Sequence, residues 1–212
     1  MKKGIIFDID GTIWDATVEV TYAWNLALRE VEEFNIQIDI SDMMSFMGIT
    51  AYDIGEKMLP ASLSHKRKRE IVDSCLAMQS IYQRTHHSPT YENAIPTIRE
   101  LSKKYNIYIV SNCPHGYIDN LFLQTGLSDV ISDYEYHGRT GLPKSGSIKV
   151  LMERNSIDKA VYLGDTDGDY RACKEAGIPF IHAAYGYGNP HEPTPSISSF
   201  NELPEAVAKI LD

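Results

Sequence analysis

The sequence predicts an α/β fold in which a doubly wound parallel sheet carries an inserted block of helices. An apolar run at residues 4–9 has the character of a buried strand. Residues 16–87 then show only the helical spacing of apolar side chains. From residue 107 onward, short apolar runs alternate with helical segments, a pattern typical of parallel strands that are covered on both faces.

Composition narrows the class of protein. The chain has 212 residues, of which 43% are hydrophobic, so it can bury a sizeable core as one domain or as a domain with an insertion. Its net charge of -9 argues against nucleic acid and against an anionic membrane, because both partners need a basic surface. No run has the length of a membrane span or forms a signal-peptide core. The cysteines Cys75, Cys113 and Cys173 form no CxxC pair, so we expect reduced thiols in a cytoplasmic protein.

The first strand, from Gly4 to Ile9, delivers two carboxylates to the loop that follows it. Gly11 makes a sharp turn inexpensive, so Asp8 and Asp10 can face one reaction centre. Two neighbouring carboxylates repel each other unless they share a cation or one keeps its proton. The placement predicts a metal, acid/base chemistry, or both. A solvated turn is the alternative, since Asp and Gly are ordinary turn residues.

The inserted block is expected to contain four helices. The first runs from Thr17 to Phe34 and is capped by Asp15 or Thr17. Shorter helices follow at about residues 41–46 and 50–58, and a long one begins after a Ser64 cap. The block would lie above the carboxyl ends of the strands, where ligands bind in open α/β sheets. We therefore expect two domains, a core of residues 1–15 and 88–212 and a helical-bundle cap of residues 16–87.

The later strands complete a Rossmann-like sheet. They are expected at residues 107–110, 130–132, 160–163 and 178–181. Residues 186–195 contain three prolines and two glycines and are expected to form a surface loop, and a helix near 204–211 ends the chain.

Polar residues follow the ends of several strands, and in a parallel sheet these ends share one edge. They are Asp8 and Asp10 after the first strand, Ser111 and Asn112 after the second, Lys144 at the start of a later helix, and Asp165, Asp167 and Asp169 after the strand at 160–163. Carboxylates with one lysine suit a Mg2+ site that binds a phosphoryl group. Lys144, Ser111, Asn112 and the backbone at Gly11-Thr12 would stabilise charge on the transferring oxygens.

The order of these motifs resembles the haloacid dehalogenase superfamily of aspartyl-phosphate hydrolases. Asp8-Ile9-Asp10-Gly11-Thr12 is similar to its first motif, Ser111-Asn112 to its second, Lys144 to its third, and Gly164-Asp165 with Asp169 to its fourth. The helical insertion is similar to the small cap of the phosphoglycolate phosphatase and β-phosphoglucomutase branch. Tyr185-Gly186-Tyr187-Gly188 resembles a loop that this branch carries after its last core strand.

The resemblance implies a role for each site residue. Asp8 would attack phosphorus, and Asp10 would protonate the leaving alkoxide and later deprotonate the hydrolytic water. Mg2+ would be held by Asp8, by the backbone carbonyl of Asp10 and by Asp165, with Asp169 ligating through water or orienting the ligands. Thr12, Ser111, Asn112 and Lys144 would bind the phosphoryl group. Asp167 is interpreted as a solvated loop acid.

Some positions keep two interpretations. Trp14, bulkier than the family's usual residue, either narrows the mouth of the site or packs in the hinge. Asn93 is expected to cap a helix. The segment 46–50 is either a substrate-specificity loop or a plain turn between helices. Lys149 is an alternative to Lys144, although it falls inside a predicted helix.

These residues predict a Mg2+-dependent phosphatase of a small phosphorylated metabolite. We expect a monomer or a homodimer, although no residue pattern distinguishes the two. Phosphoglycolate, sugar phosphates and nucleoside monophosphates all remain open as substrates. A phosphomutase of the same fold and a catalytically silent metabolite-binding protein are the alternatives. A true dehalogenase is disfavoured, because a halide leaving group needs no acid and Asp10 would be superfluous.

Overall fold

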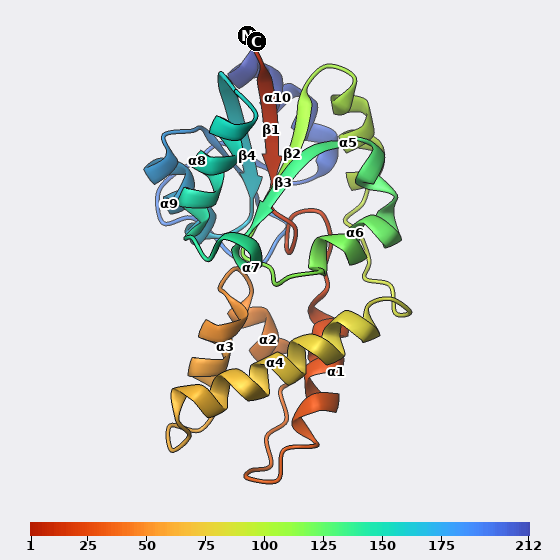
Figure 1. Cartoon of the computed structure of the whole chain (residues 1–212). Helices are drawn as coiled ribbons and strands as arrows, with labels where there is room; N and C mark the ends of the chain where they lie inside the picture. Colours follow the sequence, from red (N-terminus) through yellow and green to blue (C-terminus); the bar gives the residue numbers. More distant parts are fainter.

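The computed structural model describes residues 1–212 and contains one sheet of six parallel strands in the order β3-β2-β1-β4-β5-β6 (Figure 1). The strand order reverses between β1 and β4, which is the arrangement of a doubly wound sheet. The predicted fold class is therefore confirmed. The strands are β1 Lys3–Phe7, β2 Asn106–Ser111, β3 Ile131–Tyr136, β4 Lys159–Gly164, β5 Phe180–Ala183 and β6 Ser196–Ile197.

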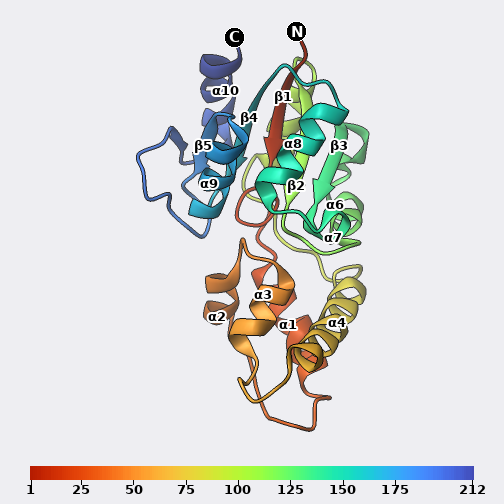
Figure 2. The ribbon, with the colours of Figure 1, turned by 60° about the vertical axis from the view of Figure 1, so that its left-hand side comes forward.

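Helices cover both faces of the sheet (Figure 2). Those that follow the inserted segment are α5 Ala94–Ser102, α6 Tyr117–Thr125, α7 His137–Thr140, α8 Lys144–Arg154, α9 Asp167–Ala176 and α10 Leu203–Leu211. Ile6 of β1 packs on one face with side chains of α8 and α9. Ile5 and Phe7 point to the opposite face, toward α5, α6 and α10. All three β1 side chains are fully buried, so the apolar run forms a central strand as predicted.

Four further helices lie together beyond the carboxyl ends of the strands (Figure 1). They are α1 Thr17–Leu28, α2 Ile40–Phe46, α3 Ala51–Met58 and α4 His65–Tyr82. A hydrogen bond of 2.7 Å from Nε1 of Trp24 to Oε1 of Gln79 joins α1 to α4. The helix after Ser64 begins as predicted, because the Ser64 hydroxyl accepts a hydrogen bond from the Arg67 backbone. No helix combines the length and apolar character that a membrane-spanning segment needs.

The first helix is shorter than predicted. It ends at Leu28 rather than Phe34, and the chain then returns so that the buried Asn25 side chain exchanges two hydrogen bonds with the backbone of Ile38. Three glutamates at positions 30, 32 and 33 would have stood near the negative end of a longer helix, where acidic side chains are unfavourable.

Other expectations need smaller corrections. β3 continues to Tyr136, well beyond the predicted residue 132, β5 lies two residues later than predicted, and the two-residue β6 was not expected. Asn93 precedes α5 but makes no side-chain cap, since its backbone takes a left-handed conformation with φ of 60°. Ala16 occupies the cap position of α1, although Oδ1 of Asp15 accepts a hydrogen bond from the Thr17 backbone.

Candidate active site

Asp8 stands directly after β1, at the carboxyl edge of the sheet. Its backbone N–H still donates to the Leu163 carbonyl at 2.9 Å, so β1 and β4 hold it firmly. Three residues later the chain turns at Gly11, where φ is 74°. A Cβ there would lie only 2.1 Å from Oδ2 of Asp165. Glycine is therefore required for the first loop to approach the loop after β4.

A group of three buried carboxylates forms where these two loops meet. Asp8, Asp165 and Asp169 each place an oxygen within 4.8 Å of the others. Nζ of Lys144 donates to Oδ2 of Asp8 at 2.8 Å and also to Oδ1 of Asp169. Lys144 reaches this group as the first residue of α8. The lysine thus bridges two of the three carboxylates and leaves the group with net negative charge.

Two oxygens of this group have no hydrogen-bond partner. They are Oδ1 of Asp8 and Oδ1 of Asp165, and both are buried. In contrast, both oxygens of Asp169 are engaged, one by Lys144 and the other by the backbone and hydroxyl of Thr166 at 3.0 and 2.6 Å. Unpartnered buried carboxylate oxygens are costly, and a hard divalent cation prefers such ligands. The donor set therefore fits a bound divalent ion, with Asp169 orienting its neighbours.

The ionisation of the group depends on burial. Burial raises the pKa of Asp8 to about 6 and that of Asp165 to about 8, although Lys144 acts to lower both. Burial acts in the same direction on Asp169, but the charge and hydrogen bond of Lys144 hold its pKa below the usual value. The Asp165 carboxyl therefore needs an added positive charge to ionise at neutral pH, whereas Asp8 is already mostly ionised there.

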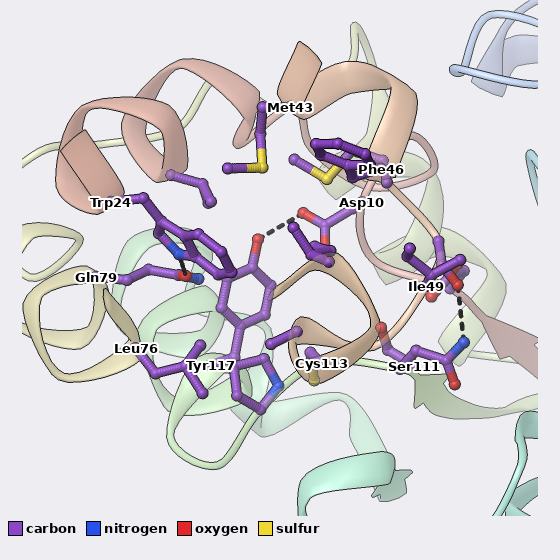
Figure 3. A pocket seen from close by; sticks show the side chains of 18 of the residues that line it. Asp10, Trp24, Met43, Phe46, Ile49, Leu76, Gln79, Ser111, Cys113 and Tyr117 are labelled. Atoms are coloured by element: carbon purple, nitrogen blue, oxygen red, sulfur yellow. Dashed lines mark hydrogen bonds between the residues drawn. The ribbon is translucent and has the colours of Figure 1, made fainter. Parts of the chain in front are cut away.

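Asp10 is held apart from the three carboxylates. Its Oδ1 accepts a hydrogen bond from the hydroxyl of Tyr117 at 2.5 Å (Figure 3). The same oxygen accepts a second one from Nε1 of Trp14 at 2.9 Å. The two aromatic rings meet edge to face, with centroids 5.4 Å apart. Burial raises the pKa of Asp10 to about 7, against the lowering effect of the Tyr117 hydrogen bond. A carboxyl group in this range can both give and take a proton near neutral pH.

Comparison with known proteins identifies the family. The sequence profile of the haloacid dehalogenase-like hydrolases matches residues 5–183. The chain belongs to this family. The predicted family and the predicted class of enzyme, a hydrolase, are therefore confirmed.

Similar proteins are phosphatases by description. Phosphoglycolate phosphatase of Vibrio vulnificus strain YJ016 is 26% identical over 231 residues, covering 99% of this chain and 95% of the relative. The crystal structure of a predicted phosphoglycolate phosphatase from Haemophilus somnus 129pt superposes with a TM-score of 0.84 at 19% identity, covering 97% of both chains. CbbY of Rhodobacter sphaeroides, crystallised with xylulose 1,5-bisphosphate, has a TM-score of 0.76 at 15% identity over 96% of each chain. The last two likenesses bear on the fold alone.

The hydrolase has one pocket that reaches Asp8 and Asp10. Ser111, Asn112 and Lys144 also line it, so the structure brings five of the predicted site residues together there. Thr12 is buried near the turn, its hydroxyl has no partner, and it lines neither this pocket nor the carboxylate group. Its role as a phosphoryl ligand stays a prediction.

The segment 46–50 is part of this pocket rather than a turn remote from it. Met47, Gly48 and Ile49 line the pocket, and Nδ2 of Asn112 donates to the Gly48 carbonyl at 2.8 Å. A Cβ at Gly48 would lie 3.1 Å from the Thr166 side chain, so this loop also touches the loop after β4. The inserted helices therefore contact the site through this segment.

Two interpretations of acidic and aromatic residues need correction. Asp167 is not a solvated loop acid: it opens α9, is 16% exposed, and pairs with Arg171 at 3.0 Å. Trp14 is fully buried and lines no part of the pocket, so it does not narrow the mouth. It packs as expected and in addition donates to Asp10. Lys149 is exposed on α8, which leaves Lys144 as the lysine of the site.

Tyr117 and Tyr187 were not anticipated from the sequence. Tyr117 reaches Asp10 from α6. The Tyr187 backbone donates to Oδ2 of Asp165 at 2.8 Å, while its hydroxyl donates to Oδ1 of Asp15 at 2.7 Å. The resemblance of the loop at 185–188 drew attention to its glycines, whereas the sequence carries no signal for these tyrosine contacts.

Proposed function

We propose that this hydrolase is a Mg2+-dependent phosphomonoesterase that acts on a small phosphorylated metabolite through an aspartyl-phosphate. One observation carries the proposal: the Asp8 carboxylate lies at the end of β1, bonded through one oxygen to Lys144 and unpartnered at the other. It lines the same pocket as Asp10, the carboxyl group suited to proton transfer. The phosphatases among the relatives support the same reaction class.

Mg2+ would be held by the carboxylates of Asp8 and Asp165 and by the backbone carbonyl of Asp10. The unpartnered oxygens of the two carboxylates support this assignment. When bound, the ion supplies positive charge that offsets the carboxylates and the phosphoryl oxygens. Both oxygens of Asp169 already accept hydrogen bonds, from Lys144 and from Thr166, so Asp169 would orient these residues rather than bind the ion directly.

The chain's own residues then account for both half-reactions. The Asp8 carboxylate attacks phosphorus, the bond from phosphorus to the leaving oxygen breaks, and Asp10 gives its proton to that oxygen. Asp10 next takes a proton from a water molecule that attacks the aspartyl-phosphate, which releases phosphate and restores Asp8. Lys144, Ser111, Asn112 and Thr12 would hold the phosphoryl oxygens during both steps.

We also propose that residues 16–87 form a cap that closes over a core of residues 1–15 and 88–212. The contact between Asn112 and Gly48 would belong to the closed state. Closure would exclude water while Asp8 attacks, and reopening would release the product. A cytoplasmic location and a monomeric or homodimeric state stay predictions.

Phosphate release tests this function. We expect Mg2+-dependent release from a panel of small phosphomonoesters by the wild type, and none above background by Asp8→Asn. Asp167→Asn, outside the carboxylate group, is the matched control and should retain release. A wild type that binds a phosphomonoester but releases no phosphate from any would contradict the hydrolase proposal and favour the phosphomutase or the silent binding protein.

A further inference from the structure

The pocket beside Asp10 differs sharply in character between its two ends. One end holds Asp8 and Lys144, which would act on the phosphoryl group, and Asp10 lies at the boundary with the other end. The other end extends between the inserted helices, and the whole pocket has a cavity volume of about 60 Å³. Because Asp10 stands between the two ends, the extended end would receive the leaving alcohol of a substrate.

The extended end is lined by apolar side chains from all four inserted helices and the segment 46–50. Eleven of the nineteen residues around the pocket are hydrophobic. Figure 3 shows Trp24 and Leu76 on the far side of Tyr117 from Asp10, and Phe46 and Ile49 on the side of Asp10 itself. Such a surface stabilises apolar groups removed from water.

The pocket offers no positive charge to a second anionic group. Lys144 is its only cationic residue, and its ammonium group is already shared by Asp8 and Asp169. Asp10 adds negative charge at the boundary of the extended end. Burying a carboxylate there without a cation or hydrogen-bond donors would be strongly unfavourable.

The few polar groups at the extended end are occupied by one another. Oε1 of Gln79 accepts from Nε1 of Trp24 at 2.7 Å, and the Gln79 amide nitrogen donates to Oε1 of Gln83 at 3.5 Å. The Tyr117 hydroxyl donates to Asp10, and the Asn112 amide donates to Gly48. A leaving group with several hydroxyls would find few partners here, which disfavours sugars as well.

We infer that the substrate is a phosphomonoester of an uncharged, mainly apolar alcohol, alkyl or aryl, rather than phosphoglycolate or a bisphosphate. This inference rests on the proposed phosphatase function and goes beyond it. The inferred substrate therefore differs from phosphoglycolate, the substrate in the relatives' names. Glycolate carries a carboxylate, which would have to lie where this pocket is apolar.

A second opening beside Lys144 is polar but does not favour an anion. It is lined by Arg171, together with the acidic residues Asp53 and Glu175. Arg171 pairs with Asp167 at 3.0 Å, which offsets part of its charge. A carboxylate that entered by this route would meet two acidic side chains, and the basic residues there are His137, the paired Arg171 and Lys144, which is shared by Asp8 and Asp169.

The decisive experiment compares phosphoglycolate with isobutyl phosphate in the presence of Mg2+. In isobutyl phosphate an uncharged isopropyl group of similar shape replaces the carboxylate. For the wild type we expect kcat/KM for isobutyl phosphate to exceed that for phosphoglycolate by at least about tenfold. Along ethyl, propyl and butyl phosphate, kcat/KM should rise about fourfold per methylene. Phenyl phosphate should also be a good substrate.

A gain-of-function variant keeps the test independent of folding defects. Leu76 is half-buried at the extended end, so an arginine there can reach a bound carboxylate. Leu76→Arg should raise the ratio of kcat/KM for phosphoglycolate to that for isobutyl phosphate by about tenfold or more, whereas the neutral Leu76→Gln should not.

The outcomes separate this inference from the proposed function. Asp8-dependent hydrolysis with phosphoglycolate preferred over isobutyl phosphate would overturn the inference, implicate the opening near Arg171, and leave the phosphatase standing. Absence of hydrolysis of every ester, phenyl phosphate included, would overturn both.

Discussion

The Tyr117 hydroxyl donates a 2.5 Å hydrogen bond to Oδ1 of Asp10 and so ties α6 to the loop that follows β1. Trp14 donates to the same oxygen through Nε1 at 2.9 Å. Both hydrogen bonds end on Oδ1, so the second carboxyl oxygen of Asp10 is the one left available to a substrate. Positioning of the proton-transfer group depends on two aromatic residues outside the carboxylate group.

Tyr117→Phe is expected to lower kcat/KM about tenfold for alkyl phosphates, whose leaving groups need a proton from Asp10. The loss should be much smaller for p-nitrophenyl phosphate, which leaves without protonation. The Tyr117 hydrogen bond lowers the pKa of Asp10. Its removal should therefore shift the basic limb of the pH profile for alkyl phosphates to higher pH. Tyr52→Phe removes a hydroxyl bonded to Asp73 instead and should change none of these values.

Lys144→Met should destabilise the fold as well as abolish activity. It leaves Asp8 and Asp169 buried beside each other without their cation, which typically costs about 3 to 5 kcal/mol. We expect urea denaturation at neutral pH to show this loss and added Mg2+ to restore part of it. Lys149→Met, on the exposed side of the same helix, should change the unfolding free energy by less than about 0.5 kcal/mol. Equal effects for the two variants would contradict the role given to Lys144.

Mg2+ affinity should increase as the pH rises from about 5.5 to about 8. Without the ion, the pKa of Asp8 is raised to about 6 and that of Asp165 to about 8. These carboxyls hold protons below those values and must release them to bind a cation, so affinity is lost as the pH falls. Calorimetry in buffers of different ionisation enthalpy should detect proton release near neutral pH. Binding with no proton release and no pH dependence would contradict this account.

Gly11→Ala should eliminate Mg2+-dependent phosphate release. A Cβ at this position, where φ is 74°, would collide with Oδ2 of Asp165 at 2.1 Å. Gly177 provides a matched control, because its φ is 77° and nothing lies within 4 Å of an added Cβ. Gly177→Ala should cost about 1 kcal/mol of stability through backbone strain while leaving turnover unchanged. Similar turnover for the two variants would show that the close approach to Asp165 is not required.

The sequence was sufficient to predict the central strands of the sheet, because they are unbroken apolar runs between helical patterns. It was insufficient to predict the extent of the edge strand β3. β3 continues through Asp133 and Glu135, which look like loop residues in the sequence. Both are compensated by Arg154 from α8, and Glu135 also by Arg139. Such compensation depends on tertiary contacts that periodicity does not report.

The same distinction applies to the site. Asp8, Ser111 and Asp165 were predictable because each ends or directly follows a parallel strand, and parallel strands end at one edge. The contacts of Tyr117 and Trp14 with Asp10 depend on how α6 and the first turn pack, so no local sequence pattern predicts them. The apolar end of the pocket likewise arises only when four helices assemble around it. Met43, for example, is buried and also lines the pocket.

The central claim, covalent attack by Asp8, is tested most directly with the Asp10→Asn variant and p-nitrophenyl phosphate. This ester's leaving group needs no acid, so Asp8 should still be phosphorylated, whereas hydrolysis of the aspartyl-phosphate lacks its base. We predict a burst of nitrophenol in the presence of Mg2+. Acid quenching and borohydride reduction should then yield homoserine at position 8. Turnover without a burst and without any modification of Asp8 would contradict the account and indicate direct attack by water.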